Sequence, residues 1–383
     1  MTVIPSFHPV GLDRDALREQ LRAGAFAGLL LTSPENVFYT TGYTSLPSAG
    51  NPILYTLRSR MPYCVVIDGE GRTTLLCWGF SAQDVDFGAD RIVGFNDYAG
   101  ALGMLRDVLR ELLPAGARLG VEDTCPRYVL ELLAEPGGVQ PELASAEAAL
   151  AALRLVKSPQ ELALVRRSTE IIEQTASELF PLLRAGMSRR EIMREARYRL
   201  LRNGATGISH LTFSFGNSNP EVEADEPLEQ GSLVTLDLGG IHEGYCSDNR
   251  RYAYVGDPPH ALVEHYRAMV AIVDAVGATL VPGTTYKEAY DTGVRLFGAN
   301  GIPLLDRFTH VGHNIGLETE EEWLGDDAES VVKAGMAINI ELYSQAPTGQ
   351  MIGNEETYLI HEHGPERISV LPREIYRVDA TAT

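Results

Sequence analysis

Four acidic residues in the second half of the chain have a spacing that suits metal chemistry. Asp237 interrupts the apolar stretch "LVTLDLG", and Glu341 interrupts the apolar stretch "AINIELY". Asp248 and Glu355 each follow one of them, after a turn that contains glycine. A carboxylate within an apolar strand is at least half buried, and a buried charge without a partner is costly. Each of these acids therefore needs a compensating positive charge.

The partner could be an arginine or a metal ion. Arg250 and Arg251 are close in sequence to the first two acids. However, four carboxylates that converge would repel each other strongly in a poorly hydrated interior. Two divalent ions about 3.5–4 Å apart would resolve this repulsion, given four carboxylates and one imidazole. A thiol-free set of oxygen and nitrogen ligands favours Mn²⁺, Co²⁺, Fe²⁺ or Zn²⁺ without ranking them.

His313 is the candidate imidazole, in the stretch "THVGHNIGLETEEEW" of residues 309–323. A lone histidine in a glycine-flanked turn is more often structural than a ligand, and the acids that follow it would ordinarily form a solvated loop. Its position between two acid-bearing segments makes His313 a predicted ligand.

A weak internal repeat suggests that the two acid-bearing segments are equivalent. The stretches that begin at Leu183 and Leu280 share glycine at +3, a hydroxyl residue at +5, a base at +7 and glutamate at +8. Two strands with a turn follow each stretch, and each strand carries one of the acids. The sequence therefore predicts a duplicated unit, helices followed by a hairpin, packed about a pseudo-two-fold axis.

The first 150 residues alternate between strand and helix patterns. Apolar runs at 28–32, 63–68, 73–78 and 117–122 read as strands, and amphipathic runs at 13–26 and 101–114 read as helices. This alternation predicts a three-layer α/β domain over residues 1–150. Residues 151–383 form the second predicted domain. Capping-box patterns at Ser158–Glu161 and Ser188–Glu191 mark two of its helices.

Bulk composition excludes several function classes. The net charge of −20 disfavours nucleic acid and anionic membrane surfaces as partners. Four scattered cysteines without CxxC spacing fit a reduced, cytoplasmic protein. The N-terminus shows no signal peptide, and no apolar stretch approaches the length of a membrane span.

Several motifs together resemble the pita-bread metallopeptidase family, which includes methionine aminopeptidase, aminopeptidase P, prolidase and creatinase. The motifs are "LVTLDLGG", "GYCSDNRR", "HVGHNIGLE", "INIELY" and "IGNEETYLI". The stretches "LLLTSPENVFYTTGYTS" and "LRLVKSPQELALVRRS" are similar to the N-terminal domain and linker of prolidases and creatinases. The resemblance implies a creatinase-like α/β N-terminal domain followed by an α+β pita-bread catalytic domain with an internal pseudo-two-fold repeat.

The resemblance also implies roles for the five residues. Asp237 would bind one metal through both oxygens, His313 and Glu341 would hold the other, and Asp248 and Glu355 would bridge the two. Glu341 would be the base that takes a proton from a metal-bridging water as it attacks an amide bond. The implied function is an Xaa-Pro dipeptidase or aminopeptidase, acting as a homodimer.

This chain departs from the family pattern at several positions. No histidine stands shortly before Asp237, and the nearest, His210, lies far upstream, where a capping or surface role is as plausible as a place in the substrate pocket. Glu320 holds the place of a second family histidine, Arg250 replaces a usual threonine, and Gly353 falls where prolidases have arginine. Glu320 either binds a cationic or hydrogen-bond-donating part of the substrate or belongs to a solvated loop.

These departures keep other functions open. One alternative is a non-peptidase C–N hydrolase or lyase that acts on a small amine- or amidine-bearing metabolite. Another is a binding module without catalysis, which is disfavoured because four buried acids without metal would cost stability. Tyr39 could line the substrate pocket from the N-terminal domain, or it could pack in that domain's core.

Overall fold

The computed structural model describes residues 6–83, 85–219, 224–305 and 309–379. It divides the chain into two compact units, Met1–Arg154 and Leu155–Thr383. The sequence predicted this boundary at residue 150. Residues 1–5, which belong to the stretch on which the expectation of no signal peptide rests, lie outside the described residues. None of the described helices is both long and apolar enough to cross a bilayer.

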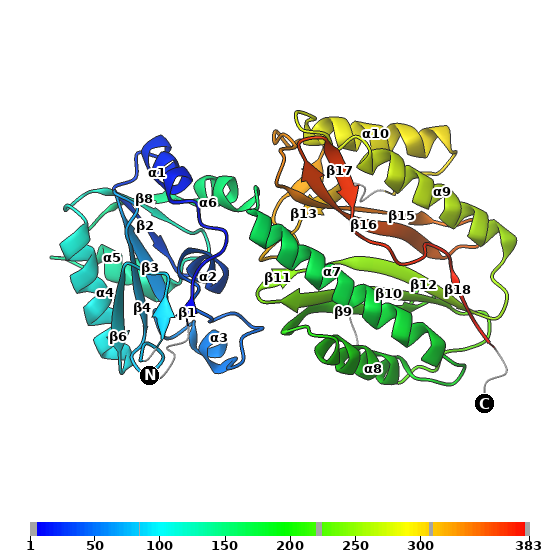
Figure 1. Cartoon of the computed structure of the whole chain (residues 1–383), viewed down its shortest axis with the longest axis horizontal. Helices are drawn as coiled ribbons and strands as arrows, with labels where there is room; N and C mark the ends of the chain where they lie inside the picture. Colours follow the sequence, from blue (N-terminus) through cyan, green and yellow to red (C-terminus); the bar gives the residue numbers. More distant parts are fainter. Residues whose placement is uncertain (1–5, 84, 220–223, 306–308, 380–383) are drawn as a thin grey trace. The chain divides into compact units, whose positions relative to one another are not determined.

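The N-terminal unit is a six-stranded sheet with helices on its two faces (Figure 1). The strand order is β6 (Arg91–Phe95), β4 (Thr73–Trp78), β3 (Cys64–Asp68), β2 (Gly28–Leu31), β7 (Arg118–Val121) and β8 (Glu142–Ser145). The helices are α1 (Arg14–Ala23), α2 (Pro34–Thr41), α3 (Ile53–Leu57), α4 (Tyr98–Leu112), α5 (Arg127–Ala134) and α6 (Glu147–Arg154). A short separate pair joins β1 (Ser6–Phe7) to β5 (Asp86–Phe87). The α/β class that the alternating pattern predicts is confirmed.

The C-terminal unit contains two five-stranded sheets. In the first, β11 (Tyr245–Cys246), β10 (Leu233–His242), β12 (Asn249–Val255) and β18 (Tyr376–Val378) lie in that order, and β9 (Gly207–Phe215) also pairs with β10. In the second, the order is β14 (Trp323–Gly325), β13 (His310–Asn314), β15 (Ala337–Gln345), β16 (Met351–His361) and β17 (Gly364–Arg367). Strands β12 and β16 bring the two sheets together.

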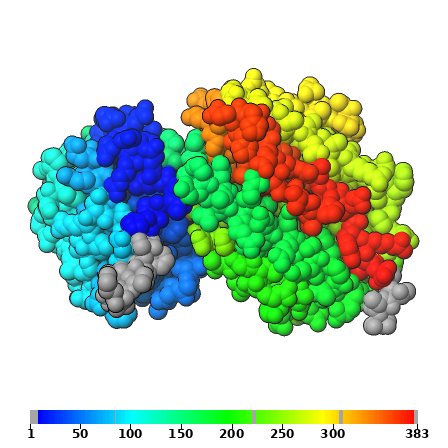
Figure 2. Space-filling view, in the orientation of Figure 1, coloured from blue at the N-terminus to red at the C-terminus, as the bar shows by residue number. Residues whose placement is uncertain are grey.

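Helices cover the two sheets separately (Figure 1). The first sheet packs against α7 (Pro159–Leu179), which continues into η1 (Phe180–Leu182), and against α8 (Arg189–Arg202). The second packs against α9 (His260–Gly277) and α10 (Tyr286–Ala299). Figure 2 shows the C-terminal segment in red, between the green surface that includes α7 and the yellow surface of α9 and α10.

The predicted repeat is present as the same local structure in both halves. Ser188 opens α8 and Thr285 opens α10, each as the first residue of a complete capping box. The glycine two residues before each cap has a positive φ, 85° at Gly186 and 101° at Gly283, which favours glycine. Each glycine N–H donates a hydrogen bond to a backbone carbonyl, at 2.8 and 2.9 Å. The two shared residue types therefore build equivalent loop-to-helix turns.

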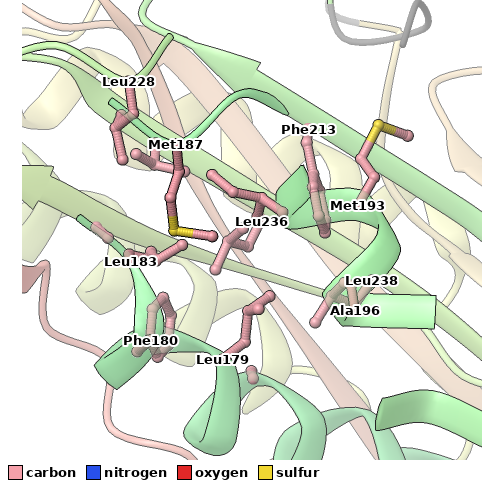
Figure 3. Packing of buried hydrophobic residues seen from close by; sticks show 14 of the residues in the cluster. Leu179, Phe180, Leu183, Met187, Met193, Ala196, Phe213, Leu228, Leu236 and Leu238 are labelled. Atoms are coloured by element: carbon pink, nitrogen blue, oxygen red, sulfur yellow. The ribbon is translucent and has the colours of Figure 1, made fainter. Parts of the chain in front are cut away.

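The core beneath the first sheet determines which way Asp237 faces. Leu236 and Leu238 on β10 are buried among apolar residues of α7, α8 and β9, including Leu179 and Phe213 (Figure 3). Because successive side chains of a strand point to opposite faces, Asp237 must point away from this core. The same alternation applies on β15, where Ile340 and Leu342 are buried on either side of Glu341.

The capping box of α7 gives a test of this fold. The Ser158 hydroxyl accepts a hydrogen bond from the Glu161 N–H at 3.2 Å, and the Glu161 carboxylate accepts one from the Ser158 N–H at 2.7 Å. Ser158→Ala should lower the free energy of unfolding by about 1 kcal/mol, because an N-terminal donor of the helix loses its partner. Ser177→Ala, at an exposed position of the same helix, is the control and should cause no loss. Equal urea midpoints for the two variants would contradict the capping role.

Candidate metal centre

Asp248, His313 and Glu355 form a buried group, referred to below as the inner group. One potential ligand atom from each lies within 4.8 Å of the others. Asp248 immediately precedes β12, His313 lies on β13 and Glu355 lies on β16, so all three strands are needed to assemble it. Their exposed fractions are 6%, 0% and 1%. The structure thus brings together three of the predicted ligands, the first and last of which are more than a hundred residues apart in the sequence.

The inner group has polar atoms that nothing in the described part of the chain satisfies. Nε2 of His313 and Oε2 of Glu355 are buried without a hydrogen-bond partner there. The opposite atom of each side chain is held, because His313 Nδ1 lies 3.3 Å from the Asn314 carbonyl oxygen and Glu355 Oε1 accepts from Asn339 Nδ2 at 2.5 Å. Buried polar atoms normally have partners. The oriented imidazole and carboxylate therefore fit a cation between them.

The electrostatics of Glu355 lead to the same conclusion. Burial raises the pKa of its carboxyl group well above the usual range, and the negative charges of Asp248, Glu341 and Asp237 raise it further. The charged form is disfavoured because four carboxylates are crowded together in a poorly solvated place. A positive ion at the inner group would reverse this effect.

His210 lies against the acids, although its distance in sequence argued against this. Its Nε2 atom is 3.2 Å from Asp237 Oδ1 and 3.1 Å from Asp248 Oδ1. His210 is on β9, which pairs antiparallel with β10, the strand that carries Asp237. The two residues are therefore close in space, although a loop separates their strands in the sequence. The cross-strand partner of His210 is Gly239, where a Cβ would lie 2.3 Å from the His210 ring. The missing side chain at Gly239 leaves the space that the imidazole occupies.

The protonation of His210 follows from these neighbours. Burial would lower the pKa of the imidazole, but the carboxylates of Asp248 and Asp237 raise it well above its usual value. The two carboxylates therefore favour the protonated form of the ring.

Arg250 connects Asp237 to Glu341. Its Nη2 and Nε atoms donate to Asp237 Oδ2 at 2.5 and 3.2 Å, and its Nη1 atom lies 2.7 Å from Glu341 Oε1. Burial would lower the pKa of Arg250, but Asp237, Glu341 and Glu355 raise it well above its usual value. The sequence offered Arg250 only as a possible partner for one buried acid. The structure gives it two.

A cavity of about 720 Å³ opens onto these side chains. His210, Asp237, Asp248, Arg250 and Glu341 line one part of it. The rest of the wall includes Thr319 and Glu320 from the acidic stretch, the polar residues Thr212, Ser214, Asn217 and Thr235, and the larger residues Tyr343, Met351 and Ile352.

Glu320 is therefore on the wall of the cavity, although its backbone segment is exposed. Partial burial raises the pKa of its carboxyl group, and the nearby charges of Glu341 and Asp248 raise it further, while His313 lowers it. The position agrees with the pocket interpretation of Glu320, whose role in substrate binding stays a prediction.

The structure also shows the surroundings of Tyr39 and Gly353, two positions considered in the sequence analysis. Tyr39 is 2% exposed in the N-terminal unit, and its hydroxyl donates to the Leu153 carbonyl oxygen at 2.8 Å, which agrees with the core-packing interpretation. A Cβ at Gly353 would lie 2.0 Å from the Leu342 carbonyl oxygen. The strands approach too closely there for any side chain, so the prolidase arginine has no equivalent at this position.

The chain is similar to known proteins over most of its length. A model of metallopeptidase family M24 matches residues 163–362, and a model of the Creatinase/Prolidase N-terminal domain matches residues 14–156. An Xaa-Pro dipeptidase of Pyrococcus horikoshii is 25% identical over 354 residues, which cover 91% of this chain and 93% of the relative. An Xaa-Pro dipeptidase of Pyrococcus furiosus is 28% identical over 276 residues, covering 70% and 78%. The solved prolidase from Pyrococcus furiosus has a TM-score of 0.78 at 23% identity, with 93% of this chain and 99% of that chain covered.

Glu321, next to the cavity residue Glu320, has a structural role that can be tested. Its carboxylate lies 2.6 Å from Lys157 Nζ, and the two side chains are 5% and 1% exposed. Glu321→Gln should lower the free energy of unfolding by about 3 kcal/mol, because it leaves the lysine charge buried without its partner. Urea unfolding followed by circular dichroism measures this change. Glu329→Gln, at an exposed position of the same loop region, is the matched control, and equal stability of the two variants would contradict the buried pair.

Proposed function

We propose that this chain, which belongs to metallopeptidase family M24, is a metal-dependent dipeptidase that hydrolyses Xaa-Pro dipeptides. Family membership confirms the pita-bread fold and the hydrolase class that the resemblance implied, and it implies divalent metal ions as cofactors. The observation that carries the proposal is the inner group, where a buried imidazole and a buried carboxylate face a common point beside a cavity. The two Pyrococcus relatives named above are Xaa-Pro dipeptidases, so the non-peptidase alternative is not favoured.

In this proposal, Asp248, His313 and Glu355 hold a divalent ion. Their oxygen and nitrogen atoms suit Mn²⁺, Co²⁺, Fe²⁺ or Zn²⁺. A bound ion would supply a water of lowered pKa and would polarise the scissile carbonyl. The pair of ions predicted from the sequence would also need Asp237 and Glu341, both of which contact Arg250 in this structure.

Glu341 is the proposed base. Its carboxylate reaches the cavity wall, where it can accept a proton from the attacking water. The contact of 2.7 Å between Glu341 Oε1 and Arg250 Nη1 fixes the direction of the carboxylate. His210 is proposed as a positioning residue, because its Nε2 atom is directed at Asp237 and Asp248.

The cavity suits an Xaa-Pro dipeptide in size and lining. A volume of about 720 Å³ lies within the ordinary range for small-molecule sites. Tyr343, Met351 and Ile352 give one part of the wall an apolar surface that a pyrrolidine ring could cover. Hydroxyl and amide side chains elsewhere on the wall can bond the polar parts of the dipeptide.

Glu320 is the proposed partner of the free amino group. The ammonium group is the cationic part of a dipeptide, and a carboxylate on the cavity wall is its natural acceptor. This assignment gives a substrate-binding role to the position where the family's peptidases have a histidine.

The sequence-based predictions of a homodimer and of a cytoplasmic location belong to this proposal. All four cysteines are free and buried, which suits a reducing compartment.

Metal removal tests the proposed reaction. The purified protein should hydrolyse Ala-Pro and Gly-Pro in the presence of Mn²⁺, Co²⁺ or Zn²⁺, with little turnover of Ala-Ala. A chelator should abolish turnover, and the metal should restore it, because the ion activates the water.

Substitution of His313 tests the inner group. His313→Ala should abolish turnover and weaken metal binding, while His260→Ala, 90% exposed on α9, should leave both unchanged. Absence of turnover on every dipeptide with every metal would contradict the proposal.

Substitution of Glu320 tests how the substrate is bound. Glu320→Gln should raise KM for Ala-Pro about tenfold, since a hydrogen bond to a charged group contributes roughly 1.5 kcal/mol or more. Glu318→Gln, at an exposed position of the same loop, should leave KM unchanged. N-acetylated Ala-Pro lacks the ammonium group, so any residual turnover of it should be equal in the wild type and in Glu320→Gln. Unchanged KM for Ala-Pro in Glu320→Gln would rule out the assignment.

A further inference from the structure

Arg250 fills the gap between two carboxylates that the family resemblance assigns to two different metal ions. Three of its nitrogen atoms contact Asp237 or Glu341 at 2.5–3.2 Å. The guanidinium carbon also lies 5.8 Å from the centre of the Tyr343 ring. Arg250 thus contacts Asp237, Glu341 and the Tyr343 ring, and its side chain is 15% exposed.

The strand register requires Arg250 to face the acids. Arg250 is the direct cross-strand partner of Asp237, and it lies two residues after Asp248, so all three share one side of the sheet. The next residue, Arg251, points to the opposite face and is 2% exposed. There it is 3.1 Å from the buried Glu356. A shift of β12 by one residue would break this second buried pair, so the register is fixed from both faces.

Asp237 forms a second group with His210 and Asp248, whose potential ligand atoms lie within 4.8 Å of one another, but the oxygens of Asp237 already have partners. Its Oδ2 atom accepts from two nitrogens of Arg250, and its Oδ1 atom lies 3.2 Å from His210 Nε2. Binding through both oxygens, at about 2.0–2.2 Å from the ion, would displace both partners. The guanidinium cannot lose its charge at any ordinary pH. A divalent ion between Asp237 and Glu341 would therefore have to displace a permanent cation or sit against it.

The inner group differs from this arrangement. Nε2 of His313 and Oε2 of Glu355 are buried and lack hydrogen-bond partners among the described residues. Arg250 contributes a positive charge to Asp237 and Glu341, whereas no arginine or lysine contact at 4.0 Å or less is found for Glu355 or Asp248 in the described ranges. Within this cluster of acids, the side chains with a buried atom that lacks a hydrogen-bond partner in the part of the chain that the structure describes are therefore those of the inner group, in which His210 contacts only Asp248.

We propose that the guanidinium of Arg250 replaces one of the two metal ions, so that each chain binds a single divalent ion through Asp248, His313 and Glu355. The inference rests on the proposed function and specifies its metal content. Asp237 and Glu341 then serve as partners of Arg250, which keeps Glu341 oriented at the cavity wall.

Metal stoichiometry tests this proposal without reference to activity. The full-length protein is stripped with a chelator, titrated with Mn²⁺ by calorimetry, and analysed for bound manganese after gel filtration. The wild type should bind one equivalent per chain. Arg250→Thr, which introduces the residue usual in the family, should bind two. Arg250→Lys retains the charge and should stay at one, and Arg377→Thr, an exposed arginine, should also stay at one.

Each other outcome has a defined meaning. Two equivalents in the wild type would overturn the single-ion proposal and leave the dipeptidase function standing. No bound manganese in the wild type, with none of cobalt or zinc in the same titration repeated with those ions, would overturn both. One equivalent in folded Arg250→Thr, verified by its circular dichroism spectrum, would show that Arg250 does not exclude a second ion. If Arg250→Thr does not fold, the wild-type stoichiometry still decides between one ion and two.

Discussion

The structure of the C-terminal unit depends on how four carboxylates are held close together in a buried place. Asp237, Asp248, Glu341 and Glu355 come from two different sheets, and burial together with the negative charges of the other three raises the pKa of Glu355 well above its usual range. Repulsion of this kind is strong where water is scarce. Cations among the acids therefore favour the close approach of the two sheets.

The chain supplies part of this positive charge itself. Arg250 lies between Asp237 and Glu341, and His210 lies between Asp237 and Asp248. Both residues reach the acids because of backbone geometry: Arg250 through strand register, and His210 through the space left at Gly239. The inner group keeps buried atoms of His313 and Glu355 without hydrogen-bond partners among the described residues, and this is where we propose that the ion binds.

Much of this arrangement could be predicted from the sequence. The alternating patterns gave the α/β unit, the capping boxes marked α7 and α8, and the acids that interrupt apolar strands pointed to a charged site. The positions of His210 and Arg250 could not be obtained in this way. His210 depends on an antiparallel pairing across a long loop, and distance along the chain says nothing about such a pairing. The position of Arg250 depends on the register between β10 and β12, which the spacing of the acids along the sequence does not specify.

Register also shows where the two halves of the repeat differ. Glu341 faces Glu355 across its hairpin, whereas Asp237 faces Arg250, and Asp248 lies outside β12. By strand register, the counterpart of Glu355 in the first half is therefore the arginine. A pseudo-two-fold fold thus carries an asymmetric set of charges, acid against acid in one hairpin and acid against base in the other. Since like charges opposite each other are destabilising, the hairpin that holds two acids gains most from a neighbouring cation, and Arg250 of the other hairpin supplies one to Glu341.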